Sequence, residues 1–302
     1  MDSPRCVTSE DLPRVVTLLD DIFRREKGVT DQTVFTDFPL LFASDNLDHC
    51  RVIERNGQIV SHAAVWPRTL VIEGMPLKAG IIVLVATAHD HRRQGLADAL
   101  MRDLQRTLAD EQFDLGILWT GVPAFYEQLG WHVVTPRGWL THTMPLPLPA
   151  NNIQAYDSDL HLDALHHLHR QSGIHTQRSL AETAALLELP GCRVTILHSE
   201  NRPVAYLVDA DAVNKRGLIE YAGPPERVWS LVAAASNHGN ERPFLIFPTH
   251  EALARNARHE GWPVTPLSSC KGFGAEMLLI LNPDIATPEV LDRLFVWGLD
   301  QA

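Results

Sequence analysis

Cysteine is scarce in this chain of 302 residues, and no two cysteines form a Cys-x-x-Cys pair. The four stand far apart, at Cys6, Cys50, Cys192 and Cys270. This spacing argues against a zinc ribbon and against a dense disulfide framework. We therefore predict reduced cysteines with a structural role.

Long apolar runs are also missing. No uninterrupted apolar stretch approaches the roughly 20 residues that span a bilayer, and the opening Met-Asp-Ser-Pro-Arg lacks the apolar core of a signal peptide. These two absences predict a cytoplasmic protein with no membrane partner.

Basic residues are in the minority, with 26 Lys and Arg against 37 Asp and Glu, which gives a formal net charge of −11. Nucleic-acid binding depends on clustered basic residues, so this charge disfavours a nucleic-acid partner and favours a cationic small substrate. The sequence holds no Gly-x-Ser-x-Gly, Walker-type loop or His-Glu-x-x-His, which excludes the common hydrolase, nucleotide-hydrolase and zinc-protease interpretations. The histidines from His161 to His175 do not share one helical face with carboxylates, so a solvated helix is predicted there and no metal is expected.

The length fits two domains, and apolar periodicity defines the elements of the first. A first amphipathic helix is predicted over about residues 9–25, with Ser9 as its cap. Asn56-Gly57 predicts a tight hairpin turn between two strands, because this dipeptide accepts two positive φ angles. A final strand is expected from Thr141, passing into a proline-bearing linker that ends near Asn152.

One junction in the first half has the character of a phosphate site. The run Ile81 to Val85 is apolar and β-branched, as in a central strand that is buried on both faces. Arg92-x-x-Gly95-x-Ala97 follows it and leads into a helix with leucines at every fourth position. Free N–H groups and the helix dipole at such a turn favour a pyrophosphate, so the spacing suits coenzyme A.

A second motif, Phe-Tyr-Glu-Gln-Leu-Gly-Trp, runs from Phe125 to Trp131, about one helix and one strand further on. Together the two motifs resemble the signature regions of the GNAT-type N-acetyltransferase superfamily: the Arg/Gln-x-x-Gly-x-Gly/Ala loop and the Phe-Tyr-x-x-x-Gly-Phe/Trp segment. The resemblance covers about residues 5–145. It implies a mixed α/β fold with a mostly antiparallel central sheet flanked by helices, and the transfer of acetyl from acetyl-CoA to a primary amine by direct attack in a ternary complex.

The resemblance also assigns roles to residues. The backbone of Val85, Ala86 and Thr87 is expected to pair with the pantetheine arm, and Tyr126 is expected to protonate the departing thiolate. The pyrophosphate is expected on the loop residues Arg92, Arg93, Gln94, Gly95, Leu96 and Ala97. Acetyl-CoA is the expected co-substrate, with no metal, and a small molecule or a peptide is the expected amine partner.

The chain departs from the family in two places. The strand from Gly80 to Thr87 carries no acidic residue, so the general base stays open among His62, His89 and Asp45. Trp119-Thr120-Gly121 stands where many members place an Asn for coenzyme A. A longer acyl donor, or a non-catalytic acyl-CoA or metabolite sensor, therefore remains an alternative.

The second half, residues 149–302, repeats the strand pattern of residues 1–148. Its hairpin at Cys192 and its strand at Phe244 echo the first half, but Gly223-Pro224-Pro225 replaces the basic loop and Ala257 replaces the tyrosine. We predict two tandem GNAT-like domains, of which the second is degenerate and is expected to wall the amine site. The sequence does not indicate the oligomeric state.

Overall fold

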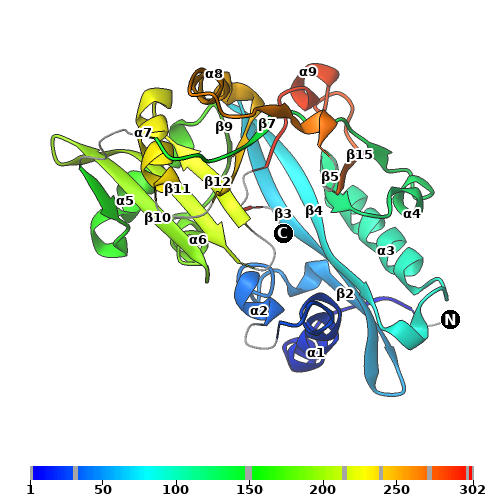
Figure 1. Ribbon diagram of the computed structural model, residues 1–302. Helices are drawn as coiled ribbons and strands as arrows, with labels where there is room; N and C mark the ends of the chain where they lie inside the picture. Colours follow the sequence, from blue (N-terminus) through cyan, green and yellow to red (C-terminus); the bar gives the residue numbers. More distant parts are fainter. Residues whose placement is uncertain are drawn as a thin grey trace.

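Two mixed β-sheets and the helices packed on them make up the fold, as a computed structural model shows (Figure 1). The structure describes residues 3–29, 33–146, 152–212, 216–237, 241–270, 274–296 and 299–300. In Figure 1 the second sheet, coloured green to yellow, lies to the left of the long strands β3 (Gln58–Ile72) and β4 (Met75–Thr87), and the helices α3 (Leu96–Asp110) and α4 (Pro123–Glu127) lie to their right. This agrees with the predicted fold class of mixed sheets flanked by helices.

The first sheet has the strand order β1-β2-β3-β4-β5-β15-β6, with β9 pairing the far end of β3. Its strands are β1 (Arg5–Cys6), β2 (Cys50–Arg55), β3 (Gln58–Ile72), β4 (Met75–Thr87), β5 (Leu115–Thr120), β6 (His132–Val133), β9 (Ile174–Thr176) and β15 (Ala275–Ile280). All pairs are antiparallel except β4 with β5.

The second sheet has the order β14-β7-β13-β12-β11-β10-β8. Its strands are β7 (Trp139–His142), β8 (Ile153–Ala155), β10 (Cys192–Ser199), β11 (Arg202–Asp211), β12 (Arg216–Ala222), β13 (Pro243–Ile246) and β14 (Thr265–Pro266). The pair β12 and β13 is parallel, and a helix connects them, as α3 connects β4 and β5. The two sheets therefore share one order of connections, which supports the hypothesis of a repeated fold.

The helices lie on the faces of these sheets. They are α1 (Leu12–Phe23), α2 (Val34–Asp37), α3 (Leu96–Asp110), α4 (Pro123–Glu127), α5 (Ser158–Gln171), α6 (Leu180–Leu187), α7 (Pro225–Ser236), α8 (Glu251–His259) and α9 (Pro288–Leu291). Short 3-10 turns precede some of them, including Ser9–Asp11 before α1 and His89–His91 before the loop that leads to α3.

Local sequence explains the early elements. Asn56 and Gly57 both have left-handed φ angles, 50° and 77°, as the predicted hairpin turn requires. The predicted first helix is present as α1, but its entry is capped by Thr8 rather than by Ser9. The reason is a reciprocal contact, since the Asp11 carboxylate accepts hydrogen bonds from the Thr8 N–H and hydroxyl, both at 2.9 Å.

Each sheet takes one strand from the other half of the chain. β7 precedes the predicted boundary at residues 148/149 but pairs with β13 and β14 in the second sheet. β15 lies near the C-terminus but pairs with β5 and β6 in the first sheet. The prediction that the strand at Thr141 closes the first domain is wrong, because the edge of β13 takes it. The boundary itself and most of the linker, residues 147–151, lie outside the described residues.

The apolar core has two parts, one on each face of the first sheet. One cluster joins α3 to the sheet through Leu100, Leu104 and Ile82. The other begins under α1, at Leu19, and continues into the second sheet at Tyr206. Because this second cluster contains residues of both halves, the halves share one core.

Candidate active site

The parallel pairing of β4 with β5 is short. It joins Ala79 to Leu115, Gly80 to Gly116 and Ile81 to Ile117, and among the described residues no further pair follows. From Ile82 to Thr87 the edge of β4 that faces β5 therefore has no strand partner. An edge of this kind offers backbone N–H and C=O groups to an extended ligand.

A bulge distorts β4 inside this open stretch. Leu84 has a left-handed φ of 50°, and the β3 register shifts there, so that Leu84 and Val85 lie opposite Ala63. The imidazole of His62 donates from Nδ1 to the Leu84 carbonyl at 2.9 Å. Burial lowers the pKa of His62 to about 4, so the ring is neutral. A bulge re-aims backbone groups, and His62 holds this one in place.

The loop after β4 presents free backbone donors. Arg93 and Gly95 have left-handed φ angles of 59° and 78°, and Gly95 is the N-cap of α3. In this part of the described chain, the N–H groups from Arg93 to Asp98 have no hydrogen-bond acceptor. A backbone with left-handed residues at alternate positions points several N–H groups toward one place, and so does the start of a 15-residue helix. Both features concentrate positive electrostatic potential at the loop. The loop is thus an anion cradle that fits a pyrophosphate.

Gly95 is required by its backbone conformation. A Cβ added there would meet no protein atom within 4 Å, so the loop has open space in front of it. Leu96 is buried beneath the loop, whereas Arg92 and Arg93 are exposed. Arg92 is partly engaged, since its Nε donates to the Thr87 carbonyl at 3.1 Å. That contact occupies one lone pair of the Thr87 backbone carbonyl, and Thr87 is one of the three residues assigned to the pantetheine arm.

Arg55 is a cation near the loop that sequence reasoning missed. It ends β2, and its guanidinium contacts His91 Nδ1 at 3.1 Å and the amide oxygen of Gln94. The hairpin that brings β2 beside β3 also brings Arg55 to the loop. A basic residue just before the Asn56-Gly57 turn was the available signal.

Tyr126 lies on the α3 face of the first sheet. It is 7% exposed and packs edge-on against Phe125 and Trp131, with ring centroids at 4.9 and 6.5 Å. Burial raises the pKa of its phenol, and a hydrogen bond with Thr120 opposes that shift. The phenol is therefore neutral at physiological pH and retains a proton to donate. Trp131 fills the space above Gly116, where a Cβ would come within 2.5 Å of the indole.

The three candidates for the general base are scattered. His62 is fully buried, with Nε2 unpartnered among the described residues. His89 is exposed and its Nε2 contacts the Glu26 carboxylate at 2.5 Å. Asp45 is exposed beside Trp66 and Arg68, in a pocket that contains no residue of the loop.

A carboxylate that the sequence analysis missed lies beside β5. Glu276 is on β15, directly opposite Trp119, and both line a cavity of about 120 Å³ between the two sheets. The other walls are mainly apolar, with Leu245, Phe247 and Phe295 among them. Burial raises the pKa of Glu276 to about 7, and Trp119 and Arg137 oppose the shift. The signal was a single Glu in the apolar run from Ala275 to Ile280.

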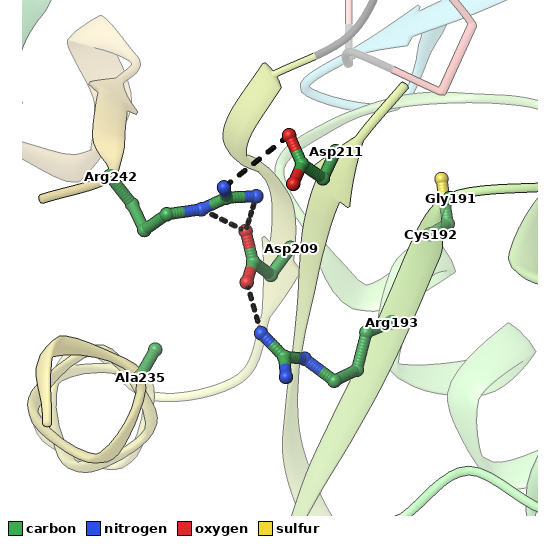
Figure 2. A pocket seen from close by; sticks show the side chains of 7 residues that line it. All are labelled: Gly191, Cys192, Arg193, Asp209, Asp211, Ala235 and Arg242. Carbon is green, nitrogen blue, oxygen red and sulfur yellow. Dashed lines mark hydrogen bonds and ion pairs between the residues drawn. The ribbon is translucent and has the colours of Figure 1, made fainter. Parts of the chain in front are cut away.

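Among its described residues, the second half offers no equivalent of the loop. Gly223 has a left-handed φ of 124°, and Pro224 accepts the N–H groups of Arg227 and Val228. One open polar pocket of this half lies elsewhere, at Arg193, Asp209 and Arg242 (Figure 2). Asp209 accepts hydrogen bonds from both guanidinium groups there, at 2.7 Å each, so the charges are paired within the protein.

Two histidines of the second half are buried in its fold. His161 and His169 are buried on α5, so the prediction of a solvated helix is wrong for them. His169 Nε2 contacts the Thr176 carbonyl at 2.8 Å. In the part of the chain that the structure describes, no group of three or more His, Cys, Asp or Glu side chains could hold a metal ion. Within the same part, no helix is long and apolar enough to cross a membrane.

Residues 3–134 match the family model described as an acetyltransferase (GNAT) domain. This part of the chain, which contains the loop and Tyr126, is similar to GNAT acetyltransferase domains. Comparison with curated protein sequences found no match.

Solved structures share the whole architecture. A probable N-acyltransferase from Enterococcus faecalis has a TM-score of 0.70 at 14% identity, with 92% of this chain and 72% of that chain covered. A GCN5-related N-acetyltransferase from Anabaena variabilis has a TM-score of 0.70 at 14% identity, covering 93% and 73%. Eis1 from Mycobacterium abscessus has a TM-score of 0.60 at 15% identity, covering 93% and 74%. At these identities the likeness establishes the fold and leaves the activity to be argued from the site.

Proposed function

We propose that the protein transfers an acetyl group from acetyl-CoA to a primary amine by direct attack in a ternary complex. The anion cradle at the start of α3, with its unpaired N–H groups beside the open edge of β4, carries this proposal. Residues 1–148 supply this acyl-CoA site, and residues 149–302 wall the amine site. The second half binds no acyl-CoA, because prolines stand where its cradle would be.

Different parts of the first half bind different parts of acetyl-CoA. Backbone donors from Arg93 to Ala97 hold the pyrophosphate, with added charge from Arg92 and Arg93. The open edge at Val85 and Ala86 pairs with the pantetheine arm, with Thr87 at its end. The bulge at Leu84, held by His62, turns a backbone N–H toward the thioester oxygen, where it stabilises negative charge.

Acetyl-CoA supplies the acyl group as a thioester. The amine nitrogen forms a bond to the carbonyl carbon, the carbon–sulfur bond breaks, and the sulfur takes the phenol proton of Tyr126. The phenol suits this task because its raised pKa keeps it protonated until a basic thiolate forms beside it. Tyr126 then regains a proton from the amine nitrogen by way of solvent.

Calorimetry with acetyl-CoA tests the cradle. We expect one site per chain in the wild type and nearly abolished binding in Gly95→Glu, whose side chain adds bulk and negative charge in front of the loop. Gly74→Glu is the matched control, because Gly74 also has a left-handed φ, 86°, and open space around its Cβ, but lies at the other end of β4. Both variants carry the same left-handed strain of roughly 1–2 kcal/mol, so only Gly95→Glu should lose affinity.

An assay of coenzyme A thiol release in the presence of amines distinguishes an enzyme from a non-catalytic acyl-CoA sensor. A protein that binds acetyl-CoA but releases no thiol with any amine would be a sensor. Unchanged affinity in a folded Gly95→Glu variant would remove the cradle assignment. A titration that shows two equivalent acetyl-CoA sites per chain would contradict the proposal that the second half binds no acyl-CoA.

A further inference from the structure

We propose that the cavity between the sheets takes the amine-bearing arm of the acceptor, and that Glu276 removes the proton from its ammonium group. The inference rests on the acetyl transfer proposed above and names the acceptor class as a primary alkylamine with a short apolar arm. It also places an essential residue in the second half of the chain, on β15.

The position of the cavity follows from alternation along β5. Neighbouring residues on a strand point to opposite faces. Leu118 packs in the apolar cluster on the α3 face, which also contains Tyr126. Trp119, one residue later, packs against the other cluster and lines the cavity. Glu276 lies opposite Trp119 across the β5–β15 pair and so shares that face. The phenol and the carboxyl thus flank the end of β5 from two sides, where a thiol could leave on one side and an amine arrive on the other.

The walls of the cavity fit an alkylammonium ion. Aromatic rings line it, with Phe247 and Phe295 stacked at 4.1 Å between centroids, and aromatic faces attract cations. The cavity volume of about 120 Å³ is about the volume that four molecules occupy in liquid water. This size suits a short aminoalkyl arm rather than a whole drug-sized molecule. Glu276 is the acidic group among the lining residues.

The ionisable groups around Glu276 are either ion-paired with another residue or neutral. Arg137 also lines the cavity, but its guanidinium is ion-paired with Asp292. His250 packs against Phe295 with centroids at 6.5 Å, and burial lowers its pKa to about 4, so it is neutral. Against this background Glu276 titrates near pH 7, where a general base is most effective.

The proton transfer is simple to balance. The ammonium N–H bond breaks, its electron pair stays on nitrogen, and the proton bonds to the Glu276 carboxylate. The neutral amine then attacks, and the carboxyl releases its proton to solvent after the product leaves. No oxidant, reductant or metal is needed.

The test uses the full chain with n-butylamine and phenethylamine as probes, thiol release as the assay and calorimetry for acetyl-CoA. In Glu276→Gln we expect a loss of kcat of roughly 10²–10⁴-fold with unchanged acetyl-CoA affinity. The wild-type kcat/KM, expressed per ammonium form of the amine, should rise with pH to a plateau above about 7, and the variant should lose that step. Glu289→Gln, which removes an exposed carboxylate on α9, is the matched control and should behave as wild type.

A second variant keeps the inference testable if Glu276→Gln does not fold. Leu245→Phe narrows the cavity and should raise the KM for n-butylamine at least 10-fold while acetyl-CoA affinity stays the same. Full activity with an intact pH step in Glu276→Gln, an unchanged KM in Leu245→Phe, or turnover of neither probe by a wild type that binds acetyl-CoA would overturn the inference. Failure of the wild type to bind acetyl-CoA would instead overturn the proposed function.

Discussion

At the scale of the residue, the most specific predictions concern Tyr126 and His62, which lie on opposite faces of the first sheet. Tyr126 has its pKa raised by burial, and His62 has its pKa lowered by the same cause, because burial disfavours whichever form is charged. Both groups are therefore neutral near pH 7. The tyrosine keeps a proton to give, and the histidine keeps its Nδ1 proton on the Leu84 carbonyl.

Tyr126→Phe removes the phenol and keeps the ring. We expect acetyl-CoA affinity within about twofold of wild type and a kcat that is lower by roughly 10²–10⁴-fold, the range for a lost general acid. Steady-state kinetics and calorimetry measure the two quantities. Tyr156→Phe is the control, since that hydroxyl lies in the second half and has no hydrogen-bond partner among the described residues. A Tyr126→Phe variant with full kcat would leave Tyr126 a core residue only.

His62 should make folding stability depend on pH. Its pKa is about 4 in the folded chain and about 6.5 when unfolded, so between these values only the unfolded state takes up the proton. Stability is therefore fully present above about pH 6.5 and falls as the pH drops toward 4. The expected loss is about 2 kcal/mol between about pH 7.5 and about pH 5.

His62→Asn provides the comparison, because an amide can still donate to the Leu84 carbonyl but does not titrate. Denaturant unfolding at the two pH values should show a smaller loss of stability in the variant by about 2 kcal/mol. Equal pH dependence in both proteins would mean that His62 does not titrate in this way.

At the scale of the element, β15 has the largest consequence for the first half. It covers the edge of β5 along its whole length, from Ala275 opposite Thr120 to Ile280 opposite Leu115, and it is the partner of β6. Without it, a central apolar strand becomes an exposed edge, which invites aggregation. Glu276 would be lost as well.

A chain that ends at residue 148 should therefore be insoluble or aggregated. The measurement is the soluble fraction after expression, followed by size-exclusion chromatography. Joining residues 274–282 to this chain through a flexible linker should raise the soluble fraction, because the edge of β5 is paired again. A soluble, monomeric chain of residues 1–148 that turns over amines would contradict both the need for β15 and the role of the second half.

At the scale of the whole molecule, a buried ionic cluster ties the halves together. Arg178 donates to both carboxylate oxygens of Glu220, at 3.0 and 2.7 Å, and to Asp300 at 3.1 Å. Arg68 of β3 donates to the same Asp300 at 2.8 Å. These four side chains are at most 3% exposed. The cluster joins β3 of the first sheet, β12 of the second and the C-terminal segment.

Arg178→Met should destabilise the protein by roughly 3–5 kcal/mol, because it removes the buried cation that Glu220 and Asp300 share and leaves only Arg68 to pair with Asp300. Arg193→Met is the control, since Arg193 is 62% exposed in its ion pair and should cost less than about 1 kcal/mol. Equal unfolding midpoints in denaturant for the two variants would contradict a stabilising role for the cluster.

Acid should weaken this ionic cluster. The pKa of Glu220 is about 2 in the folded protein, so folding stability falls as the pH drops below the pKa that Glu220 has in the unfolded chain.

Local sequence was sufficient wherever neighbours along the chain decide the structure. The Asn56-Gly57 turn, helix α1, the glycine loop at Gly95 and the helix that carries Tyr126 all follow from turn chemistry, periodicity and motif spacing. Such features depend on conformations and contacts over a few residues. The same information showed that the second half lacks a basic loop.

Only the tertiary structure decided which strand lies beside β5 and β13. Strand pairing depends on which edges meet in space, and a short apolar strand can satisfy any exposed edge of suitable length. β15 reaches the first sheet across more than a hundred residues of chain, and β7 goes to the second. The sequence by itself therefore determined the acyl-CoA loop and Tyr126 as candidates, whereas the placement of Glu276 opposite Trp119 came from the exchange of strands, which no local pattern encodes.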